Sequence, residues 1–414
     1  MFNVVGDCLE QLSRHHGTFW GKYTFVFLSN ILERVYPLEE YTIVSHLKYS
    51  KFHTSSEVIT LAENRMGYAA NAQIVGKEEQ ILKKQPLPPL KIYCHKNVYI
   101  RHSSDYVFNK EEKSVINDFC ANNENDNNKY VDKRQFVIVR RKERIDKELE
   151  SGIKLGGKFS FNYYHSIYEH LIRLLPLSEK NDVIPKEVPI IIDEEFWNIP
   201  SLKRIYDILS RNLGRPTIIL RKEEQILVHN LYCISDINYI VPEHKDYTKG
   251  LIEDYVFDKD YTLKLRNTLL LYRSKCELPK RFFITRRNTN HRHFNEDELF
   301  AIIEPFGFQK IAPEDFSFEQ QMSLFYDAEY IIGGSGAAFT NLLFTSPGCM
   351  TVCVYRNSPY IPAVFTVPAC FNDAKLLYFQ TSKGVSVMKA HTDFSIDAEE
   401  FKQYVNTLFQ PLLA

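Results

Sequence analysis

The sequence lacks several features that would place it at once in a functional class. No run of about 18 apolar residues occurs in its 414 residues, which excludes an ordinary transmembrane helix. The eight cysteines are scattered without a C-x-x-C pair, so neither a disulfide framework nor a zinc site is predicted. Lys and Arg number 51 against 52 for Asp and Glu, a balance that argues against a general nucleic-acid binder. A P-loop and a serine-nucleophile elbow are also absent.

The composition is that of a globular protein, with 44% hydrophobic and 25% charged residues and length for two or three domains. The first residues lack the basic start and apolar core of a signal peptide, and the single cysteines indicate reduced thiols. We therefore expect a cytoplasmic protein. An aromatic stretch at 19–28 suits either a buried element or peripheral contact with the inner face of a membrane.

Helices and strands alternate along most of the chain. Predicted strands at 188–192, 217–220 and 226–231 are interleaved with helices at 163–175 and 200–212. After a predicted linker at 243–275, a second block has strands at 281–285 and 308–311 and helices at 296–305 and 317–327. We also expect paired strands at 90–94 and 97–100 and a last helix at 396–409, capped by Ser395 or Asp393. The pattern predicts an α/β protein with two Rossmann-like domains facing a cleft.

The domain boundaries follow from composition. Residues 86–89, Pro-Leu-Pro-Pro, form a stiff break, so residues 1–85 are a separate N-terminal segment whose role the sequence does not indicate. The two α/β blocks then divide at the linker into domains at 86–260 and 261–414.

The most informative stretch is 330–344. An apolar strand at 330–332 is followed by Gly333, Gly334 and Gly336, and then by helical spacing at 337–344. A strand, a glycine loop and a helix present backbone N–H groups to an anion, so this stretch predicts a site for a phosphate-bearing ligand such as a nucleotide. A plain glycine turn between a strand and a helix is the alternative.

A second motif lies on the helix predicted at 163–175. His165, Glu169 and Arg173 recur every four residues and therefore share one helix face. An imidazole beside a carboxylate and a guanidinium suits acid–base chemistry on a hydroxyl. A solvated ladder of ion pairs is the alternative interpretation.

A third motif places Arg286 and Arg287 at the carboxyl end of the strand at 281–285, where guanidinium groups match phosphate oxygens. Surface cations are the alternative. The basic run at 290–293 would extend such a phosphate site. The triplet Asp258-Lys259-Asp260 has the form of a metal-binding D-x-D motif, but its charged surroundings favour a solvated charge run.

Together, these blocks resemble glycosyltransferase family 61 over roughly 155–355, about half of the chain. The family's Asn-aromatic-aromatic-His segment ends in Glu-x-x-x-Arg-Leu, and its later blocks are a strand ending in Arg-Arg, an Asn-Glu-(Asp/Glu)-Glu helix start, a Ser-Phe-x-Glu-Gln helix and a glycine loop. The counterparts here are residues 162–174, 284–287, 295–298, 317–321 and 333–341. The sequence departs from the family pattern at four positions, Ser166 for Trp, Gln320 for Glu, Ser335 for His and Ala338 for Gly.

The resemblance implies a GT-B-like, inverting, metal-independent transferase of hexosyl or pentosyl units, which needs no cofactor. Its partners would be a nucleotide-sugar donor, bound mainly by 261–414, and a glycan or lipid-linked acceptor on 86–260, in assembly of a bacterial capsule, exopolysaccharide or lipopolysaccharide. His165 and Glu169 would be catalytic, and the acceptor side would comprise Asn162, Tyr164 and Arg173. The donor would contact Arg286, Arg287, Gly334, Ser335, Gly336, Ala337, Thr340 and Asn341.

Two other functions are compatible with parts of the sequence. A non-catalytic nucleotide- or sugar-binding module of a polysaccharide assembly complex is favoured by Ser335 in place of His. Such a module has no need to keep all four of His165, Glu169, Arg286 and Arg287. A nucleotide-sugar epimerase would require an acidic pair across the cleft, which the sequence does not locate.

Overall fold

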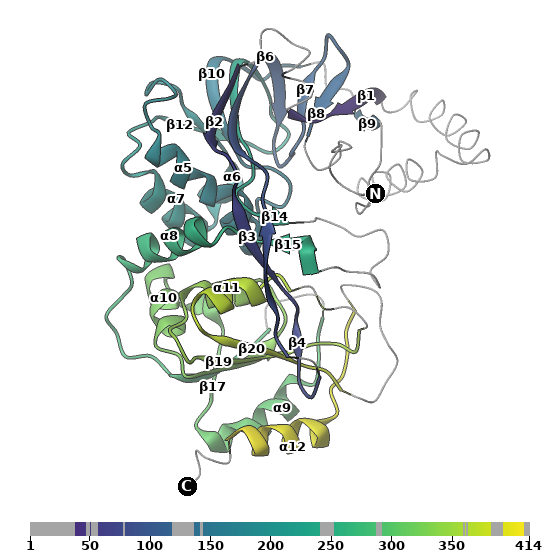
Figure 1. The fold of residues 1–414 in the computed structure, drawn as a ribbon, viewed down its shortest axis with the longest axis vertical. Coiled ribbons are helices and arrows are strands. Elements are labelled where there is room, and N and C mark those ends of the chain that lie inside the picture. The colour runs from purple at the N-terminus through teal and green to yellow at the C-terminus, as the bar shows by residue number, and fades with distance from the viewer. Residues whose placement is uncertain are drawn as a thin grey trace, which may run out of the picture.

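The structure is a computed structural model with two large sheets stacked along its long axis (Figure 1). It describes residues 38–46, 50, 57–77, 79–117, 136–140, 144–240, 252–286, 292–358, 361, 363–381 and 392–409. The aromatic stretch at 19–28, Arg287, and Asn290 and His291 of the basic run at 290–293 lie outside these residues. The α/β class predicted from the sequence is confirmed.

The first sheet has ten strands and mixes parallel with antiparallel pairs. Four pairs of neighbouring strands are parallel. Most of the antiparallel pairs include the long strand β6 (Leu90–Arg101). The remaining strands are β1 (Leu38–Val44), β2 (Glu57–Ala62), β7 (Val107–Asn109), β8 (Ser114–Ile116), β9 (Phe136–Arg140), β10 (Lys147–Leu155), β11 (Ile190–Asp193), β12 (Thr217–Leu220) and β13 (Gln225–Ile234).

Successive side chains of these strands point to opposite faces of the sheet, and helices pack on the apolar side chains of one face. Ile190 and Ile192 of β11 pack in the cluster that contains the helices, whereas Ile191 between them packs in a separate cluster on the opposite face. The helices are α5 (Leu174–Glu179), α6 (Glu194–Asn198), α7 (Pro200–Ser210) and α8 (Lys259–Leu270), preceded by the short turns α4 (Tyr163–His165), η1 (Ser166–His170) and η2 (Leu171–Arg173).

The second sheet is parallel throughout, and its five strands from β16 to β20, numbered in chain order, follow the doubly wound order 2-1-3-4-5. In space the order is β17 (Gln309–Ile311), β16 (Arg281–Ile284), β18 (Tyr330–Gly334), β19 (Met350–Val354), β20 (Lys375–Phe379) and β4 (Gln73–Ile74). Its helical elements are α9 (Glu296–Ile303), η4 (Glu304–Phe306), η5 (Pro313–Asp315), α10 (Phe318–Tyr326), η6 (Ala337–Phe344), α11 (Thr366–Phe371) and α12 (Ala398–Phe409).

The two faces of the second sheet bury different clusters. Phe283 of β16 packs with α9 and α12, which lie at the far end of the molecule from the first sheet (Figure 1). Phe282 and Ile284 on the same strand point to the other face, toward α10, α11 and the first half of the molecule. Alternate side chains of β16 therefore pack the sheet against the outer helices on one face and against the rest of the protein on the other.

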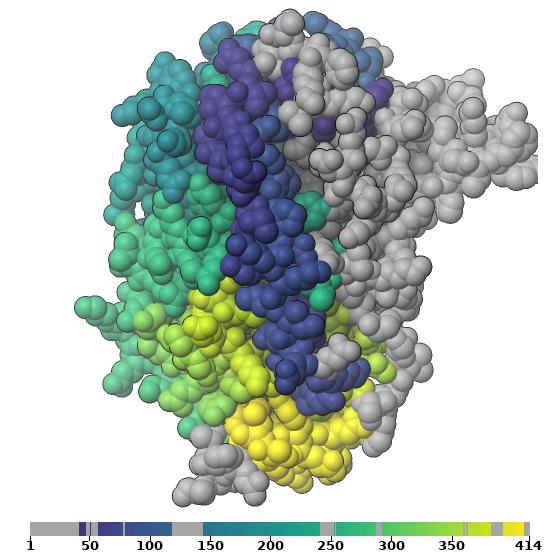
Figure 2. Space-filling model, in the orientation of Figure 1, coloured from purple at the N-terminus to yellow at the C-terminus, as the bar shows by residue number. Residues whose placement is uncertain are grey.

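Part of the chain before residue 90 spans both halves. The hairpin of β3 (Met66–Ala70) and β5 (Leu82–Pro86) carries β4 at its tip, and β4 pairs in parallel with β20 at the edge of the second sheet. Just before this hairpin, β2 pairs with β6 in the first sheet. This stretch forms a continuous dark-blue and purple band down one face of the molecule (Figure 2). A second short hairpin joins β14 (Tyr239–Ile240) to β15 (Tyr255–Val256).

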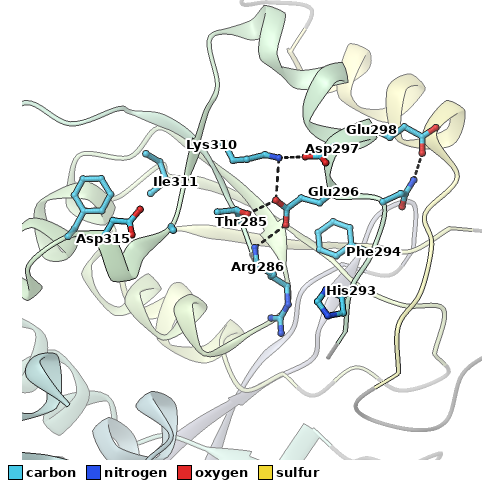
Figure 3. Close-up of a pocket in the computed structure, with 13 residues that line it drawn as sticks. Thr285, Arg286, His293, Phe294, Glu296, Asp297, Glu298, Lys310, Ile311 and Asp315 are labelled. Atoms are coloured by element: carbon cyan, nitrogen blue, oxygen red, sulfur yellow. Dashed lines mark hydrogen bonds and ion pairs between the residues drawn. The ribbon is translucent and has the colours of Figure 1, made fainter. Parts of the chain in front are cut away.

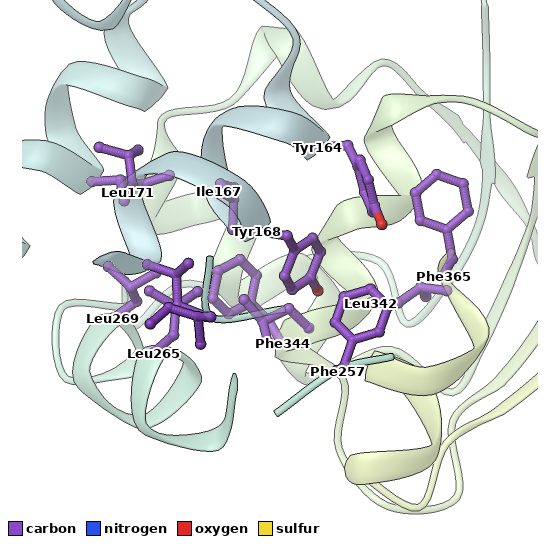
Figure 4. Packing of buried hydrophobic residues seen from close by; sticks show 14 of the residues in the cluster. Tyr164, Ile167, Tyr168, Leu171, Phe257, Leu265, Leu269, Leu342, Phe344 and Phe365 are labelled. Carbon is purple, nitrogen blue, oxygen red and sulfur yellow. The ribbon is translucent and has the colours of Figure 1, made fainter. Parts of the chain in front are cut away.

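A single hydrophobic cluster connects the two halves (Figure 4). Ile167, Tyr168 and Leu171 from the first half belong to the same buried cluster as Leu342 and Phe344 of η6. All five side chains are fully removed from solvent. An interface this apolar resembles a domain core and favours a fixed arrangement of the two halves.

Because the cluster is shared, we expect Leu342→Ala to lower the free energy of unfolding by about 2–5 kcal/mol, in one transition for the whole molecule. Urea unfolding followed by tryptophan fluorescence and circular dichroism would measure this loss. Leu271→Ala is the matched control, since Leu271 is 83% exposed and its truncation creates no cavity. Two separate transitions in the Leu342 variant would contradict a shared core.

Several sequence expectations are corrected. The strands expected at 90–94 and 97–100 form one strand, β6, and the expected linker contains α8. The segment at 337–344 is a 3₁₀ helix, and α12 is capped by Asp397, whose carboxylate accepts hydrogen bonds from the N–H groups of Glu399 and Glu400. Among the described helices, none has both the length and the apolar character needed to cross a bilayer.

Candidate functional site

The site lies where the connections of the second sheet diverge. The chain passes from β16 to β17 on one side and then to β18 on the other, so the connections after β16 and β18 run in opposite directions at their carboxyl ends. Doubly wound sheets bind ligands in the crevice that this reversal creates. Arg286 and the glycine loop both follow these strands, and the structure brings them together.

The glycine loop makes room for Arg286. The guanidinium Nη1 donates a hydrogen bond to the carbonyl oxygen of Ser335 at 2.7 Å. A Cβ atom on Gly336 would lie 2.2 Å from that Nη1, and one on Gly334 would lie 2.5 Å from the ring of Phe294. The glycines are therefore required by the packing of neighbouring side chains. The N–H of Ser335 already donates to the carbonyl of Val354 at 3.2 Å, so it is occupied within the protein.

Three arginines gather at this edge of the sheet. Burial, together with the charge of Arg292, lowers the pKa of Arg286 to about 10. Burial also lowers the pKa of Arg292, and the charge of Arg356 acts on it in the same direction. Arg356 is only 8% exposed and follows the end of β19. Partly buried guanidinium groups that repel one another are stabilised by a multiply charged anion.

A pocket of about 830 Å³ adjoins Arg286 (Figure 3). Its wall is organised by Glu296, which accepts hydrogen bonds from the hydroxyl of Thr285 and, at 2.9 Å, from the backbone N–H of Arg286. Lys310 approaches the same carboxylate at 3.3 Å. Glu296 thus fixes the end of β16 and with it the start of Arg286. The volume suits a ligand the size of a nucleoside with attached phosphates.

His165 and Glu169 form a hydrogen-bonded pair at the start of the helical stretch in the first half. The distance from His165 Nδ1 to Glu169 Oε1 is 2.6 Å, and the two side chains are 22% and 19% exposed. Burial raises the pKa of Glu169, and the hydrogen bond from His165 opposes that shift. With Nδ1 directed at the carboxylate, Nε2 is the imidazole atom left to exchange a proton with a ligand.

The backbone under this pair is irregular. Asn162 begins α4 by accepting a hydrogen bond from the N–H of Tyr164 at 3.0 Å. The next turn, η1, is a π-helix, in which the N–H of Leu171 bonds back to Ser166. Single π-turns are often found at functional sites. The sequence spacing predicted a regular helix here, and composition alone gives no signal for the extra residue in the turn.

Arg173 does not join the His165–Glu169 pair. Its guanidinium instead pairs with Asp236, which lies just beyond β13. Of the three residues predicted to share one helix face, only His165 and Glu169 therefore contact each other. Asp236 was missed in the sequence, where an isolated acidic residue after a strand carries no motif.

Other predicted residues lie at the junction between the halves. Tyr163 OH donates to Asn341 Oδ1 at 2.8 Å, which connects α4 to η6, and Asn341 Nδ2 donates to Gln321 at 3.2 Å. Thr340 and Asn341 are each 1% exposed, and Tyr164 is buried edge-on against the ring of Phe365. Ala337 begins η6. The roles assigned to these residues in ligand binding stay predictions.

Because Tyr163 bridges the two halves, we expect Tyr163→Phe to lower the free energy of unfolding by about 1–3 kcal/mol, since Asn341 would keep a buried, unsatisfied oxygen. Thermal unfolding would measure the loss. Tyr272→Phe is a suitable control, because the Tyr272 hydroxyl accepts a hydrogen bond from the exposed Arg211 at 3.2 Å and does not bridge the two halves through a buried partner. An equal change in both variants would contradict a bridging role.

The two aspartates of the D-x-D triplet lie in different environments, because Asp258 is buried and Asp260 is exposed. Asp258 caps α8 by accepting a hydrogen bond from the N–H of Tyr261, and it forms a buried ion pair with Arg65 at 2.9 Å. Asp260 is exposed in the first turn of the same helix. The expectation of a solvated charge run is therefore wrong for Asp258, whose carboxylate serves the fold.

Comparison with protein families places most of this site in one matched region. The model of the family glycosyltransferase 61 matches residues 163–353, just under half of the chain. The matched region extends from α4 to β19 and contains the His165–Glu169 pair, Arg286, the pocket and the glycine loop. No curated protein matches the sequence. The match supports glycosyl transfer as the activity.

Proposed function

We propose that the chain is an inverting, metal-independent glycosyltransferase that moves a sugar from a nucleotide-sugar donor to a hydroxyl of a growing glycan. The observation that carries the proposal is the cluster of Arg286, Arg292 and Arg356, in which Arg286 lines the pocket of about 830 Å³. The pocket, Arg286 and Arg292 lie within the region matched to glycosyltransferase 61, and Arg356 follows that region by three residues. The two stacked sheets, each with its own helices, are compatible with a GT-B arrangement.

The donor half of the site would be the second sheet. The nucleoside would occupy the pocket, where Phe294 offers a ring, and the diphosphate would lie against the three arginines. As the sugar leaves, the diphosphate takes the electron pair of the broken C–O bond and gains negative charge. Fixed guanidinium groups stabilise that charge without a metal ion, because they are already oriented and partly desolvated.

The acceptor half would contain the His165–Glu169 pair. Nε2 of His165 would take the proton of the acceptor hydroxyl as its oxygen attacks the anomeric carbon from the side opposite the diphosphate, which inverts the configuration. Glu169 would hold Nδ1–H in place and stabilise the imidazolium that results, at the observed 2.6 Å. The connection of Tyr163 to Asn341 supports the placement of this pair on an element that faces η6.

The biological setting rests on the resemblance alone. We propose a bacterial surface polysaccharide such as capsule or lipopolysaccharide as the product, made on a glycan or lipid-linked acceptor at the cytoplasmic face of the membrane. The non-catalytic alternative, a sugar- or nucleotide-binding module, is favoured only by Ser335 at the position where the family has His. It does not account for the His165–Glu169 pair, which binding of a nucleotide does not require.

The test is donor turnover across UDP-, GDP-, CMP- and dTDP-sugars, with and without EDTA, combined with calorimetric titration of the free nucleoside diphosphates. We expect one donor to be hydrolysed or transferred at a rate that EDTA does not change. Strict dependence on added metal would overturn the metal-independent mechanism. Tight nucleotide binding without turnover, even with a panel of glycan acceptors, would favour the binding module.

A further inference from the structure

A second group of chemically notable side chains lies in the first sheet, outside the proposed transfer site. His46 follows β1, His95 is on β6 and Cys233 is on β13, and their potential ligand atoms all lie within 4.8 Å of one another. His95 and Cys233 are fully and almost fully buried, at 0% and 7% exposure. Two nitrogen donors and one sulfur donor form the kind of set that binds zinc.

The sheet register explains why these residues meet. In the antiparallel pair of β6 and β13, Tyr93 lies opposite Cys233 and His95 lies opposite Leu231. Residues two apart on a strand share a face, so His95 and Cys233 are diagonal neighbours on one side of the sheet. His46 then approaches from β1, and its ring stacks on Tyr93 and His95 with centroids 5.2 and 5.0 Å apart.

The ligand atoms lie close enough to share one ion after small side-chain shifts. His46 Nδ1 and His95 Nε2 form a hydrogen bond at 2.7 Å, which a bound ion would replace. Tetrahedral zinc, with bonds of about 2.0–2.3 Å, holds its ligand atoms about 3.3–3.6 Å from one another. Insertion of the ion therefore requires the two imidazole nitrogens to separate by less than about 1 Å, which rotation of the partly buried His46 side chain can supply.

The surroundings leave both space and balanced charge. A cavity of about 50 Å³ is lined by His46 and Cys233 together with Lys154, Arg173, Asp105 and Asp236. This volume has room for an ion and one water molecule as a fourth ligand. The two cationic side chains on its wall are matched by two carboxylates, and Arg173 pairs directly with Asp236.

We propose that His46, His95 and Cys233 bind one Zn²⁺ ion, with water from the adjoining cavity as the fourth ligand. The ion would join the segment after β1 to the centre of the first sheet and so stabilise the fold. It takes no part in the proposed sugar transfer, and it does not depend on the function proposed above. His46 and His95 are 49 positions apart in the chain, and His95 and Cys233 are 138 apart, so the site has no short sequence motif.

The experiment is metal analysis of the purified full chain, followed by removal of the metal through long dialysis against EDTA and reconstitution with Co²⁺. We expect about one zinc per chain in the purified protein, and the Co²⁺ form to show a near-ultraviolet thiolate-to-cobalt band with the visible bands of tetrahedral coordination. Cys233→Ser should lower metal affinity by about 10- to 100-fold or more and remove the thiolate band.

Cys94→Ser is the matched control. Cys94 is a buried thiol on β6, directly next to His95, and its side chain points to the other face of the sheet. We expect this variant to keep both the zinc and the cobalt spectrum. If Cys233→Ser does not fold, His46→Asn tests the same site from the partly buried side. Wild-type protein without zinc and without a cobalt spectrum, or equal metal retention in the Cys94 and Cys233 variants, would overturn the proposal.

Discussion

Replacement of Arg286 by Ala is expected to lower donor turnover by about 10²- to 10³-fold and to remove most of the nucleoside diphosphate affinity. The side chain is held against the glycine loop by its bond to the Ser335 carbonyl, so its position is fixed before a ligand arrives. Charge that is oriented in advance stabilises a departing diphosphate more than mobile surface charge does. Steady-state kinetics and calorimetry with the preferred nucleotide would measure both losses.

The ligand-free variant should not be less stable than the wild type. Burial and Arg292 both lower the pKa of Arg286, which means that the folded state disfavours its charged form. Removing the guanidinium therefore removes a repulsion, and the melting temperature without nucleotide should stay equal or rise. The stabilisation that added nucleotide gives to the wild type should disappear in the variant.

Arg281→Ala is the control for this experiment. Arg281 begins the strand that Arg286 follows, and its guanidinium contacts Glu329 at 3.4 Å, at the amino end of β16. The variant removes one guanidinium charge at the other end of β16, away from the proposed donor site, so activity should be unchanged. Full activity of Arg286→Ala, or equal losses in both variants, would contradict a role for Arg286 in binding diphosphate.

Glu169→Gln is expected to lower kcat by about 10²- to 10⁴-fold and to leave donor affinity nearly unchanged. Glutamine keeps the size of the side chain, but it has no charge to stabilise an imidazolium at His165. The donor would contact the other half of the protein, which the substitution does not reach. Single-turnover kinetics and calorimetric donor titration separate the chemical step from binding.

The pH dependence follows from the same pair. Burial is the largest influence on Glu169 and raises its pKa above the ordinary value, so Glu169 takes up a proton at a higher pH than an exposed glutamate does. As the pH falls through that raised pKa, the carboxylate loses its charge and kcat should fall. A pH profile of kcat would show this acid limb in the wild type, and Glu169→Gln should lack the part of it that Glu169 causes.

A matched control exists in the first sheet. His229 and Glu148 form a similar pair, at 2.8 Å, but on exposed strand positions away from α4. Glu148→Gln should therefore leave both kcat and its pH dependence unchanged. Equal effects of the substitutions at Glu148 and Glu169 would rule out a specific catalytic role for the pair at His165.

The sequence predicted much of the second half because that half follows local rules. The apolar strand at 330–332 and the charged start of the helix at 296–305 are periodic signals, and each forms an element close to the expected position. The glycine loop was found for the same reason. The packing reason for its glycines was less predictable, since Gly336 is required by contact with Arg286, about 50 residues earlier in the chain.

The site was harder to predict where it depends on long-range contacts. His165 and Glu169 were found from helical spacing, and the structure joins them by a hydrogen bond. Arg356 was missed, because a single arginine after a strand has no distinctive spacing and gains meaning only beside Arg292. The helix α8 was missed because its charged first turn resembles a linker, whereas burial of Leu265 and Leu269 stabilises it as a helix.

The pairing of β4 with β20 has a consequence for how the protein is made. Gln73 lies opposite Leu377, so the two partners are about 300 residues apart in the chain. At a synthesis rate of about 5–20 residues per second, β4 leaves the ribosome roughly 15–60 s before its partner. During that interval the tip of the early hairpin has an unpaired backbone that other strands can reach. The last edge of the parallel sheet therefore closes only near the end of translation, and a chain released early would expose both edges to association with other chains.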